Sequence, residues 1–437
     1  MHTVPSTSAA TLAPARACAY TVLRRVFEQG AYADRALQAE AAGLEPRDRA
    51  LAMRLAYGAV QRKGTLDHLI ERLTERPAAA LDAPVLAALR LGLYELLYLS
   101  GAPDYAVVAE AVELAKTGSP PARAGHGLVN AVLRRAAREG ADALLGALRE
   151  ETPEQAAVKH SHPEWIARLW WKELGAQEAR ALMACDNEPG EVALRANTLV
   201  TDAAALAQQL PVRTHLDPGL AEALVLEEPF DAHASQLWQQ GAFLAQSRAA
   251  MRVAHALAPV PGERVLDLCA APGGKSTHLA ALMDARGELV AVERDRRRAG
   301  ALQRVAQRLR CANVRVELGD AALERPEGPV FDRVLVDPPC SGLGTLQFRA
   351  DLRWRVTPDA IAQMAGAQAR ILAAGAGALR PGGVLVYSTC TISATENERL
   401  IASFLDSQPE FVLDDVVVTL PHRDHTAGFF IARLRRS

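Results

Sequence analysis

A regular alternation of short apolar strands with helices is the feature of this sequence that most restricts its fold. Beyond about residue 240, strands are predicted at residues 264–268, 288–293, 314–318, 333–337 and 383–389. Helical spacing of apolar residues occupies the intervals, for example residues 275–284 and 295–310. Such alternation is typical of a mostly parallel sheet covered by helices on both faces. The sequence therefore predicts an α/β domain over residues 240–437.

The rest of the chain carries different patterns. Residues 15–140 are predicted to be all-helical, since apolar residues recur at three- and four-residue spacing in segments such as 86–99. Residues 141–239 carry a mixed pattern, in which residues 191–197 read as a strand, and they predict a small α+β connecting module. Residues 1–14 lack the basic and apolar stretches of a signal peptide, so a disordered tail is expected there.

Composition excludes several classes of protein. The net charge of −2 provides no overall basic field, although local basic patches remain compatible with a nucleic-acid partner. No run of about 18 apolar residues is present to span a bilayer, and no membrane partner is expected. The six cysteines form neither a CxxC pair nor a dense disulfide framework, which is typical of the reducing cytoplasm. They are Cys18, Cys185, Cys269, Cys311, Cys340 and Cys390.

The first strand of the α/β domain runs directly into a glycine-containing turn that precedes a helix. Paired glycines let the backbone approach a ligand closely, and the helix N-terminus offers free N–H groups to a carboxylate or phosphate. One of only five lysines adds a positive charge, and Ser276 or Thr277 is expected to cap the helix. The spacing of a Walker A loop is absent. The turn comprises Cys269, Ala270, Ala271, Pro272, Gly273, Gly274 and Lys275.

Three carboxylates follow successive strands of the same domain. Glu293 ends the second strand, Asp320 follows the third and Asp337 ends the fourth. Ligands of open α/β sheets bind at this edge, where an acidic residue after the second strand is placed to accept hydrogen bonds from ribose hydroxyls. The three acids suit a ligand with a ribose, an exocyclic amine and a cationic centre. S-adenosylmethionine has all three, and it is the predicted cofactor.

Two cysteines also follow strands of this sheet. Cys340 lies in DPPCSG (residues 337–342), and Cys390 ends STC (residues 388–390). In a parallel sheet both loops emerge at the edge that carries the glycine-containing turn, so the two thiols can approach each other.

A thiol at this edge fits methylation of cytosine at C5, a carbon that is a poor nucleophile. A thiolate that adds to C6 makes C5 enamine-like, and C5 then attacks the methyl sulfonium. A carboxylic acid near ring N3 stabilises the adduct, and a base removes the C5 proton so that the thiolate leaves. Cys390, Asp337 and Cys340 are the candidates for these roles. The residues alone do not say which cysteine attacks.

The order of three motifs resembles a known family. CAAPGGK (269–275), DPPCSG and STC are arranged as in the NOL1/NOP2/Sun family of RNA 5-methylcytosine methyltransferases. The resemblance covers the predicted α/β domain and implies a Rossmann-like, S-adenosylmethionine-dependent catalytic domain. It implies Cys390 as the nucleophile and Cys340 as the residue that assists product release. It also implies cofactor contacts from residues 269–275, Glu293, Asp320 and Asp337.

The first half of the chain resembles the bacterial Sun/RsmB branch of that family. GLVNAVLRR (127–135) is similar to its NusB-like RNA-binding domain, and SHPEW (161–165) and LRANT (194–198) are similar to the same branch. Members of the branch modify 16S ribosomal RNA. The resemblance implies a NusB-like domain over residues 15–140. The expected activity is methylation of cytosine C5 in 16S ribosomal RNA through a covalent bond from Cys390 to C6, by a monomer.

Two segments differ from that branch. Residues 344–354 stand where the branch typically has a basic stretch with His-Pro-Asp, and residues 244–248 lack an acidic residue often found after the glutamine. The first difference bears on the target nucleotide. The same chemistry on transfer RNA and a non-catalytic NusB-like assembly factor are the alternative functions. Intact Cys390 and Lys275 argue against the assembly factor.

Other conspicuous residues have less specific interpretations. Cys18, Cys185 and Cys311 are read as inert cysteines, and Cys269 is expected to shape the cofactor turn. His160 and His162 have no third ligand at a sensible spacing, so no metal is predicted. Arginines in two segments are either solvated or contact RNA phosphates. They are Arg294, Arg296, Arg297, Arg298, Arg304, Arg308 and Arg310, together with Arg134, Arg135 and Arg138.

Overall fold

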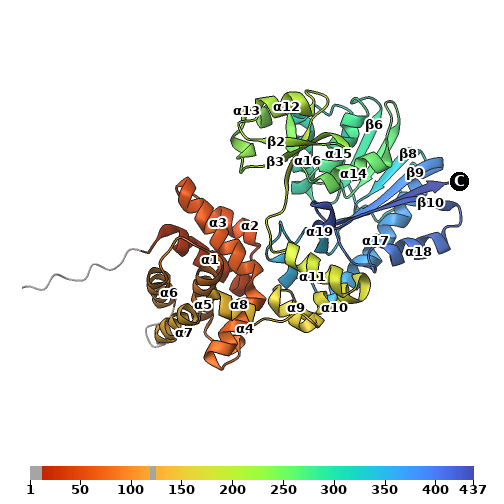
Figure 1. The fold of residues 1–437 in the computed structure, drawn as a ribbon. Coiled ribbons are helices and arrows are strands. Elements are labelled where there is room, and N and C mark those ends of the chain that lie inside the picture. The colour runs from red at the N-terminus through yellow and green to blue at the C-terminus, as the bar shows by residue number, and fades with distance from the viewer. Residues whose placement is uncertain (1–11, 119–124) are drawn as a thin grey trace, which may run out of the picture. The chain divides into compact units, whose positions relative to one another are not determined.

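The computed structural model describes residues 12–118 and 125–437 (Figure 1). Most of the expected disordered tail, residues 1–11, lies outside these ranges. The chain forms two compact units. The first comprises the chain up to Glu188 together with Leu346–Arg355, and the second comprises Pro189–Thr345 and Val356–Ser437. Within the described ranges, no helix has the length and apolar character needed to cross a membrane.

The first unit is helical. Its N-terminal helices enclose one apolar core that includes Leu23, Leu55, Leu89 and Leu133. Ala350, from the segment that the chain contributes after residue 345, is buried in the same core. The helices are α1 (Pro14–Gln29), α2 (Ala33–Glu40), α3 (Pro46–Gln61), α4 (Lys63–Thr74), η1 (Ala78–Ala80), α5 (Ala83–Tyr98), α6 (Asp104–Gly118), α7 (His126–Glu139), α8 (Ala141–Gly146), α9 (Pro153–Lys159), α10 (Glu164–Leu174) and α11 (Ala176–Cys185).

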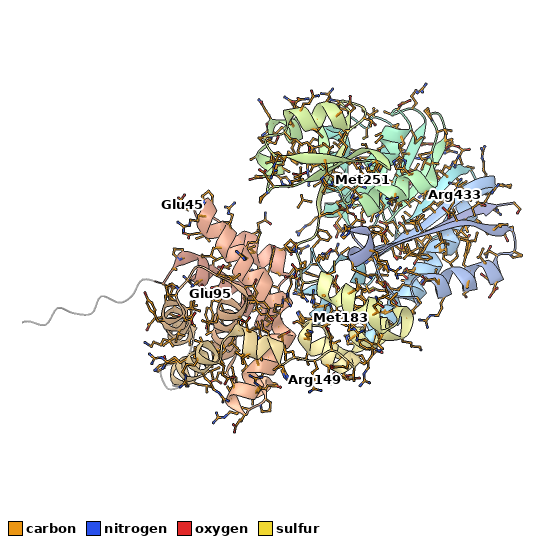
Figure 2. The ribbon with its side chains drawn as sticks, in the orientation of Figure 1. Glu45, Glu95, Arg149, Met183, Met251 and Arg433 are labelled. Atoms are coloured by element: carbon orange, nitrogen blue, oxygen red, sulfur yellow. The ribbon has the colours of Figure 1, made fainter. Side chains whose placement is uncertain are left out.

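The second unit begins with a small antiparallel sheet in the order β2-β3-β1-β4. Leu194 and Phe243 are buried in one apolar cluster of this sheet, and Ala223 and Val225 are buried in a second cluster with Met251 of helix α14 (Arg248–Leu257). Figure 2 labels Met251. Its elements are β1 (Val192–Ala196), α12 (Ala203–Gln209), β2 (Thr214–Asp217), β3 (Leu220–Leu226), η2 (Ala232–Ala234), α13 (Gln236–Gln239) and β4 (Phe243–Ala245). The mixed pattern before residue 240 therefore contains both helices and a sheet.

A seven-stranded sheet forms the centre of the second unit, in the order β10-β11-β9-β8-β5-β6-β7. The pairs among β9, β8, β5, β6 and β7 are parallel, whereas β11 is antiparallel to both β9 and β10. The strands are β5 (Arg264–Leu268), β6 (Glu288–Glu293), β7 (Val314–Leu318), β8 (Phe331–Val336), β9 (Leu379–Thr389), β10 (Phe411–Thr419) and β11 (Phe429–Arg436). This confirms the predicted mostly parallel α/β architecture. Strands β10 and β11, which follow the last predicted strand, were not predicted from the sequence.

Helices cover both faces of the seven-stranded sheet. Leu279 and Leu302 are buried in the cluster on one face, and Leu372 and Phe404 in the cluster on the other. Helix α17 packs closely on the sheet at Gly375, where an added Cβ would lie 2.8 Å from a Val336 methyl carbon. The helical elements are α14 (Arg248–Leu257), α15 (Gly274–Leu282), α16 (Arg296–Arg308), η3 (Leu343–Thr345), α17 (Pro358–Ala378), α18 (Glu398–Ser407) and α19 (Pro421–Asp424), and η4 (Leu352–Trp354) belongs to the first unit.

Candidate active site

The turn after β5 requires glycine at its centre. Gly273 precedes α15 with φ of 105°, and a Cβ there would lie 2.4 Å from a Leu302 methyl carbon. The expected side-chain cap is wrong. Ser276 donates instead to Oδ2 of Asp267 at 2.5 Å, and Thr277 donates to the carbonyl of Gly273 at 2.7 Å. Both residues lie inside the first turn, where their hydroxyls point to buried acceptors and leave the helix N-terminus open to a ligand.

A buried arginine from the small sheet holds this turn from behind. Arg195 is 1% exposed and donates to the carbonyl of Gly274 at 2.5 Å, to Thr277 Oγ1 at 2.9 Å and to Gln246 Oε1 at 2.6 Å. Burial lowers the pKa of Arg195 to about 10, so the guanidinium remains charged at neutral pH. Sequence reasoning assigned no role to Arg195. Its place in LRANT, one of the segments that resemble the Sun/RsmB branch, was the available signal.

Two of the predicted carboxylates follow neighbouring parallel strands. Glu293 is buried at the end of β6, where its Oε1 accepts the N–H of Asp295 at 2.9 Å. Asp320 is exposed two residues after β7, and its Oδ1 accepts the N–H of Ala322 at 2.9 Å. Glu293 is paired in register with Leu318 at the end of β7. Both acids therefore lie at the carboxyl edge of the sheet, beside the turn that follows β5.

Asp267 is a further acid at this edge that sequence reasoning left without a role. It is buried near the end of β5, and its Oδ1 has no hydrogen-bond partner in the described part of the chain. Burial, together with the nearby Asp337, raises the pKa of Asp267 to about 7. Its position directly before the glycine-containing turn was the signal available in the sequence.

Lys275 lies against the third predicted carboxylate. Its Nζ donates to Oδ2 of Asp337 at 2.7 Å and lies 5.2 Å from the ring centre of Phe429. Ser388 donates to Oδ1 of the same carboxylate at 2.7 Å. Burial acts to lower the pKa of Lys275, but the attraction and hydrogen bond of Asp337 outweigh it, so the pKa rises. The lysine charge of the CAAPGGK turn thus orients Asp337.

The two predicted catalytic cysteines lie together. The Sγ atoms of Cys340 and Cys390 are 3.5 Å apart, because β8 and β9 are parallel neighbours and both loops leave at the same edge. The hydrogen bond to Cys390, with burial as a second cause, raises the pKa of Cys340 well above its usual range. Cys340 therefore keeps its proton at neutral pH, beside the sulfur of Cys390.

Glu396 fastens the two cysteine loops to each other. It is fully buried and accepts the N–H of Ser341 at 2.9 Å and a hydrogen bond from Gln368 at 2.9 Å. The hydroxyls of Ser341 and Thr391 lie 2.5 Å apart. These contacts hold the backbone beside Cys340 and beside Cys390 independently of the two thiols. Sequence reasoning missed Glu396, for which an acid in the loop after STC was the only signal.

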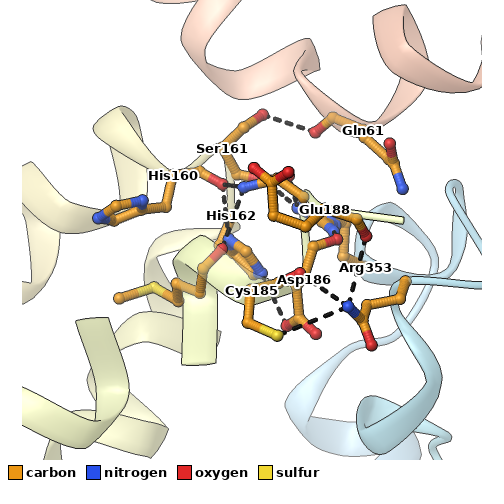
Figure 3. A network of polar contacts seen from close by, with 11 residues as sticks. Gln61, His160, Ser161, His162, Cys185, Asp186, Glu188 and Arg353 are labelled. Atoms are coloured by element: carbon orange, nitrogen blue, oxygen red, sulfur yellow. Dashed lines mark hydrogen bonds and ion pairs between the residues drawn. The ribbon is translucent and has the colours of Figure 1, made fainter. Parts of the chain in front are cut away.

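Most of the segment that differs from the Sun/RsmB branch, residues 346–354, belongs to the first unit, and Figure 3 shows Arg353 of this segment in a network of polar contacts. Arg353 is fully buried and donates to the carbonyls of Ser161 and Asp186, both at 3.0 Å, and to Asn187 Oδ1 at 2.9 Å. The indole of Trp354 donates to the carbonyl of Val60 at 2.7 Å. Six residues after Cys340, the chain thus enters the helical unit and is held there by buried polar bonds.

His160 and His162, for which no metal is predicted, belong to the same network of polar contacts. Nδ1 of His162 lies 2.8 Å from the carbonyl of His160, and its Nε2 lies 3.3 Å from Oδ2 of Asp186. Nε2 of His160 lies 2.7 Å from Oε2 of Glu150. Burial lowers the pKa of both histidines, so both rings are neutral at pH 7. These contacts account for both histidines as packing residues.

The remaining cysteines have pKa values raised by burial. Cys18 and Cys311 are buried, and burial raises the pKa of Cys311 to about 11, as it does for Cys185. Cys269 adopts φ of 65° in the turn before Pro272, and burial raises its pKa to about 12. Each of these thiols stays protonated at neutral pH.

The predicted arginine clusters divide into two kinds. Arg308 stacks on Trp238 at 4.2 Å and donates to the Trp238 carbonyl, so it packs the protein. Arg298 donates to the carbonyl of Ala271 in the cofactor turn at 2.7 Å. The predicted arginines that are exposed in and around α16 are Arg294, Arg296, Arg297, Arg298, Arg304 and Arg310. On α7, Arg134 and Arg138 line a groove of about 830 Å³ together with Tyr105.

Comparisons with known proteins cover almost the whole chain. The family described as 16S rRNA methyltransferase RsmB/F matches residues 254–435, the NusB family matches residues 13–138, and the RsmF/B-like ferredoxin-like domain matches residues 162–233. A probable ribosomal RNA small subunit methyltransferase B of Synechocystis is 36% identical over 97% of this chain and 99% of its own. The probable enzyme of the same name in Bacillus subtilis is 34% identical over 90% and 92%.

A solved structure has the same overall architecture. The crystal structure of PH0851 has a TM-score of 0.81 at 26% identity and covers 100% of both chains. A methyltransferase homolog from Pyrococcus horikoshii matches 66% of this chain and 100% of its own, with a TM-score of 0.59 at 27% identity. Together with the two thiols, the cofactor turn and relatives above 30% identity over most of their length, these matches show that the chain belongs to the RsmB/F family of 16S rRNA methyltransferases.

Proposed function

We propose that this protein transfers a methyl group from S-adenosylmethionine to carbon 5 of a cytosine in 16S ribosomal RNA. The observation that carries this proposal is the pair of sulfur atoms of Cys340 and Cys390, 3.5 Å apart beside a lysine-bound Asp337. Transfer to nitrogen needs no thiol adduct, whereas transfer to C5 needs a nucleophile and a base. The names of the relatives from Synechocystis and Bacillus subtilis support ribosomal RNA as the substrate.

The residues of the cofactor edge fit S-adenosylmethionine. The open N-terminus of α15 suits its carboxylate, and the carboxylates that follow β6 and β7 suit its ribose and adenine amine. The unpaired buried Oδ1 of Asp267 provides a further acceptor at the turn. When bound, the cofactor supplies an electrophilic methyl group on a cationic sulfur. The residues that would hold it are Cys269, Ala270, Ala271, Pro272, Gly273, Gly274, Lys275, Glu293, Asp320 and Asp337.

The short distance between the two thiols and the raised pKa of Cys340 suggest an order for the chemical steps. Cys390 adds to C6 of cytosine as a thiolate, which forms the S–C6 bond and moves the ring electrons toward N3 and C5. Asp337, held by Lys275 and Ser388, faces the polar edge of the base, and the lysine proton balances the negative charge that addition creates. Carbon 5 then takes the methyl group.

Release uses the second thiol. Once Cys390 is bonded to C6, it no longer accepts the hydrogen bond that raises the pKa of Cys340. Cys340 can then lose its proton to solvent and, as a thiolate, accept the proton that leaves C5. The C5–H electrons re-form the C5–C6 double bond, the S–C6 bond breaks, and Cys390 leaves as a thiolate. Cys390 is the nucleophile and Cys340 the release base in this proposal.

A methyl-transfer assay tests the proposed function and its alternatives. The purified full chain is incubated with S-adenosylmethionine labelled in the methyl group and either unmodified 16S ribosomal RNA or unmodified transfer RNA. Labelled 5-methylcytidine in hydrolysed 16S RNA alone is the expected result. Labelled 5-methylcytidine in transfer RNA alone would identify transfer RNA as the substrate. If neither RNA were methylated but RNA binding were retained, the protein would be identified as a non-catalytic assembly factor.

Glu293→Ala is expected to weaken S-adenosylmethionine binding about ten- to a hundred-fold, because a charge-assisted hydrogen bond contributes about 1.5–3 kcal/mol. Isothermal titration calorimetry measures the change. Glu288→Ala is the matched control, since Glu288 begins the same strand and pairs with Arg264 and Arg315 away from the carboxyl edge. Equal affinities of the two variants for S-adenosylmethionine would show that Glu293 does not contact the cofactor.

RNA contact by the helical unit has its own test. Replacing both Arg134 and Arg138 with glutamine is expected to weaken RNA binding and reduce the salt slope of log K by about 1.5, since each phosphate contact contributes roughly 0.7–0.9. Arg135→Gln is the control on the same helix, because Arg135 is paired with Glu139. Binding of 16S RNA at several salt concentrations provides the slopes. A double variant with the slope of the control would show that these arginines contact no phosphate.

A further inference from the structure

A cluster of one glutamate and two histidines lies in the second unit, outside the residues used above. Glu222 comes from β3, His255 from α14 and His278 from α15. Glu222 Oε1 lies 2.7 Å from Nε2 of His255 and 2.8 Å from Nε2 of His278. One potential ligand atom from each residue lies within 4.8 Å of the other two. Three separate elements thus direct nitrogen and oxygen donors at one point.

His278 has unsatisfied polar atoms in this cluster. The residue is 1% exposed, and neither of its ring nitrogens has a hydrogen-bond partner in the described part of the chain. Nε2 is close to Glu222 Oε1, but the ring is not turned so that an N–H bond would point at that oxygen. A buried polar group without a partner costs about 1–3 kcal/mol, so a ligand that engages it would be stabilising.

The charge states in the cluster are those of metal ligands. Burial, reinforced by the nearby Arg195, lowers the pKa of His278 to about 4, so the ring is neutral with a free lone pair at pH 7. Burial acts to raise the pKa of Glu222, but the hydrogen bond to His255 and the proximity of His278 outweigh it and lower the pKa, so the carboxylate is ionised. Neutral imidazole and ionised carboxylate are the forms in which these side chains bind zinc.

We infer that Glu222, His255 and His278 form a binding site for a divalent transition metal ion of the zinc class, a site that goes beyond the proposed methyl transfer. Two imidazoles and a carboxylate are a known donor set for zinc, with bonds of about 2.0–2.2 Å. Such bonds place neighbouring donors roughly 3.4 Å apart in a tetrahedron, so the carboxylate oxygen would withdraw by about half an ångström from each ring. The His255 side chain is 41% exposed, which leaves a fourth position to water.

The ion would connect three parts of the second unit. It would join the small sheet through Glu222, helix α14 through His255 and the cofactor helix α15 through His278, three residues after Lys275. Arg195 also faces His278, and its positive charge opposes a cation, so we expect weaker binding than in closed four-ligand sites. No metal is predicted from the sequence, in which none of these three residues belongs to a recognised motif.

Metal titration of the full chain tests this inference. The protein is freed of any polyhistidine tag, stripped with a chelator and titrated with Zn²⁺ by calorimetry and with Co²⁺ by visible absorption. Both titrations are repeated in a Cys340→Ala, Cys390→Ala background, because the two thiols are competing zinc ligands. We expect one ion per chain in that background, with a cobalt spectrum that lacks sulfur charge-transfer bands.

Variants assign the site. His255→Gln is expected to weaken Zn²⁺ binding at least tenfold, and because the residue is largely exposed, folding should be retained. His215→Gln, at an exposed histidine of β2, is the matched control and should bind as the parent does. Absence of stoichiometric binding in the cysteine-free background, or equal affinities of the His255→Gln and His215→Gln variants, would overturn the inference. The metal titrations do not depend on methyl transfer, so failure of the metal-site inference can be distinguished from failure of the proposed function.

Discussion

Cys390→Ala is expected to abolish methyl transfer to RNA while S-adenosylmethionine still binds with nearly unchanged affinity. The reason is that C5 of cytosine becomes nucleophilic only after a thiolate adds to C6, whereas the proposed cofactor site consists of the turn after β5 and the carboxylates after β6 and β7. Loss of a covalent nucleophile removes the whole pathway, so a fall in kcat of at least about 10⁴-fold is expected. Methyl transfer is measured with tritium-labelled S-adenosylmethionine, and the affinity for the cofactor is measured by calorimetry.

Cys185→Ala is a suitable control for this experiment, because Cys185 lies in the first unit and burial holds its pKa near 11. Its activity should match that of the parent chain. The loop that carries Cys390 is held by the contacts of Thr391 and Glu396, so loss of the thiol alone should not displace it. Substantial residual transfer by Cys390→Ala would assign the nucleophile to Cys340.

Cys340→Ala is expected to accumulate a covalent complex between protein and RNA. Cys390 can still add to C6 and the methyl group can still transfer, but the base that removes the C5 proton is absent, so the S–C6 bond does not break. The neighbouring Ser341 remains bound to Glu396, which keeps the loop in place in the variant. A denaturing gel with labelled 16S RNA should show a slowly migrating band that depends on S-adenosylmethionine.

The Cys340→Ala, Cys390→Ala double variant is the control that identifies the bond. It should form no such band, because the sulfur that bonds to C6 is gone. A clean gel for Cys340→Ala itself, under conditions in which the parent methylates RNA, would contradict the release role of Cys340. Multiple turnover by Cys340→Ala at the rate of the parent would contradict it as well.

Much of the catalytic unit was predictable because its strands are short, apolar and regularly separated. The predicted strands at 264–268, 288–293 and 314–318 coincide with β5, β6 and β7. In a parallel sheet that periodicity also determines which loops share an edge, so the approach of Cys340 and Cys390 followed from strand order alone. Strand β10 was missed because most of it is exposed at the sheet edge and it carries no buried apolar run, whereas β11 was missed although its first four residues are buried and apolar.

The tertiary structure decided which partners the functional residues have. The sequence placed Lys275 at the cofactor turn by its motif, but its bond to Asp337 joins residues 62 positions apart. Arg195 reaches Gly274 across 79 positions, and Glu396 binds Ser341 across 55. Short-range patterns report hydrogen-bond partners only within a turn or a cap, so such contacts leave no periodic signal.

The sequence by itself therefore determined the sheet, the edge at which its loops gather and the residue types available there. Hydrophobic periodicity is a local property of the chain, and parallel strand order converts it into a shared edge. Only the tertiary structure decided that residues 346–355 belong to the helical unit, that Glu396 fastens the two cysteine loops, and that Glu222 meets two histidines from different helices. Those outcomes depend on packing between distant segments, which decides which polar side chains are buried and which partners they find.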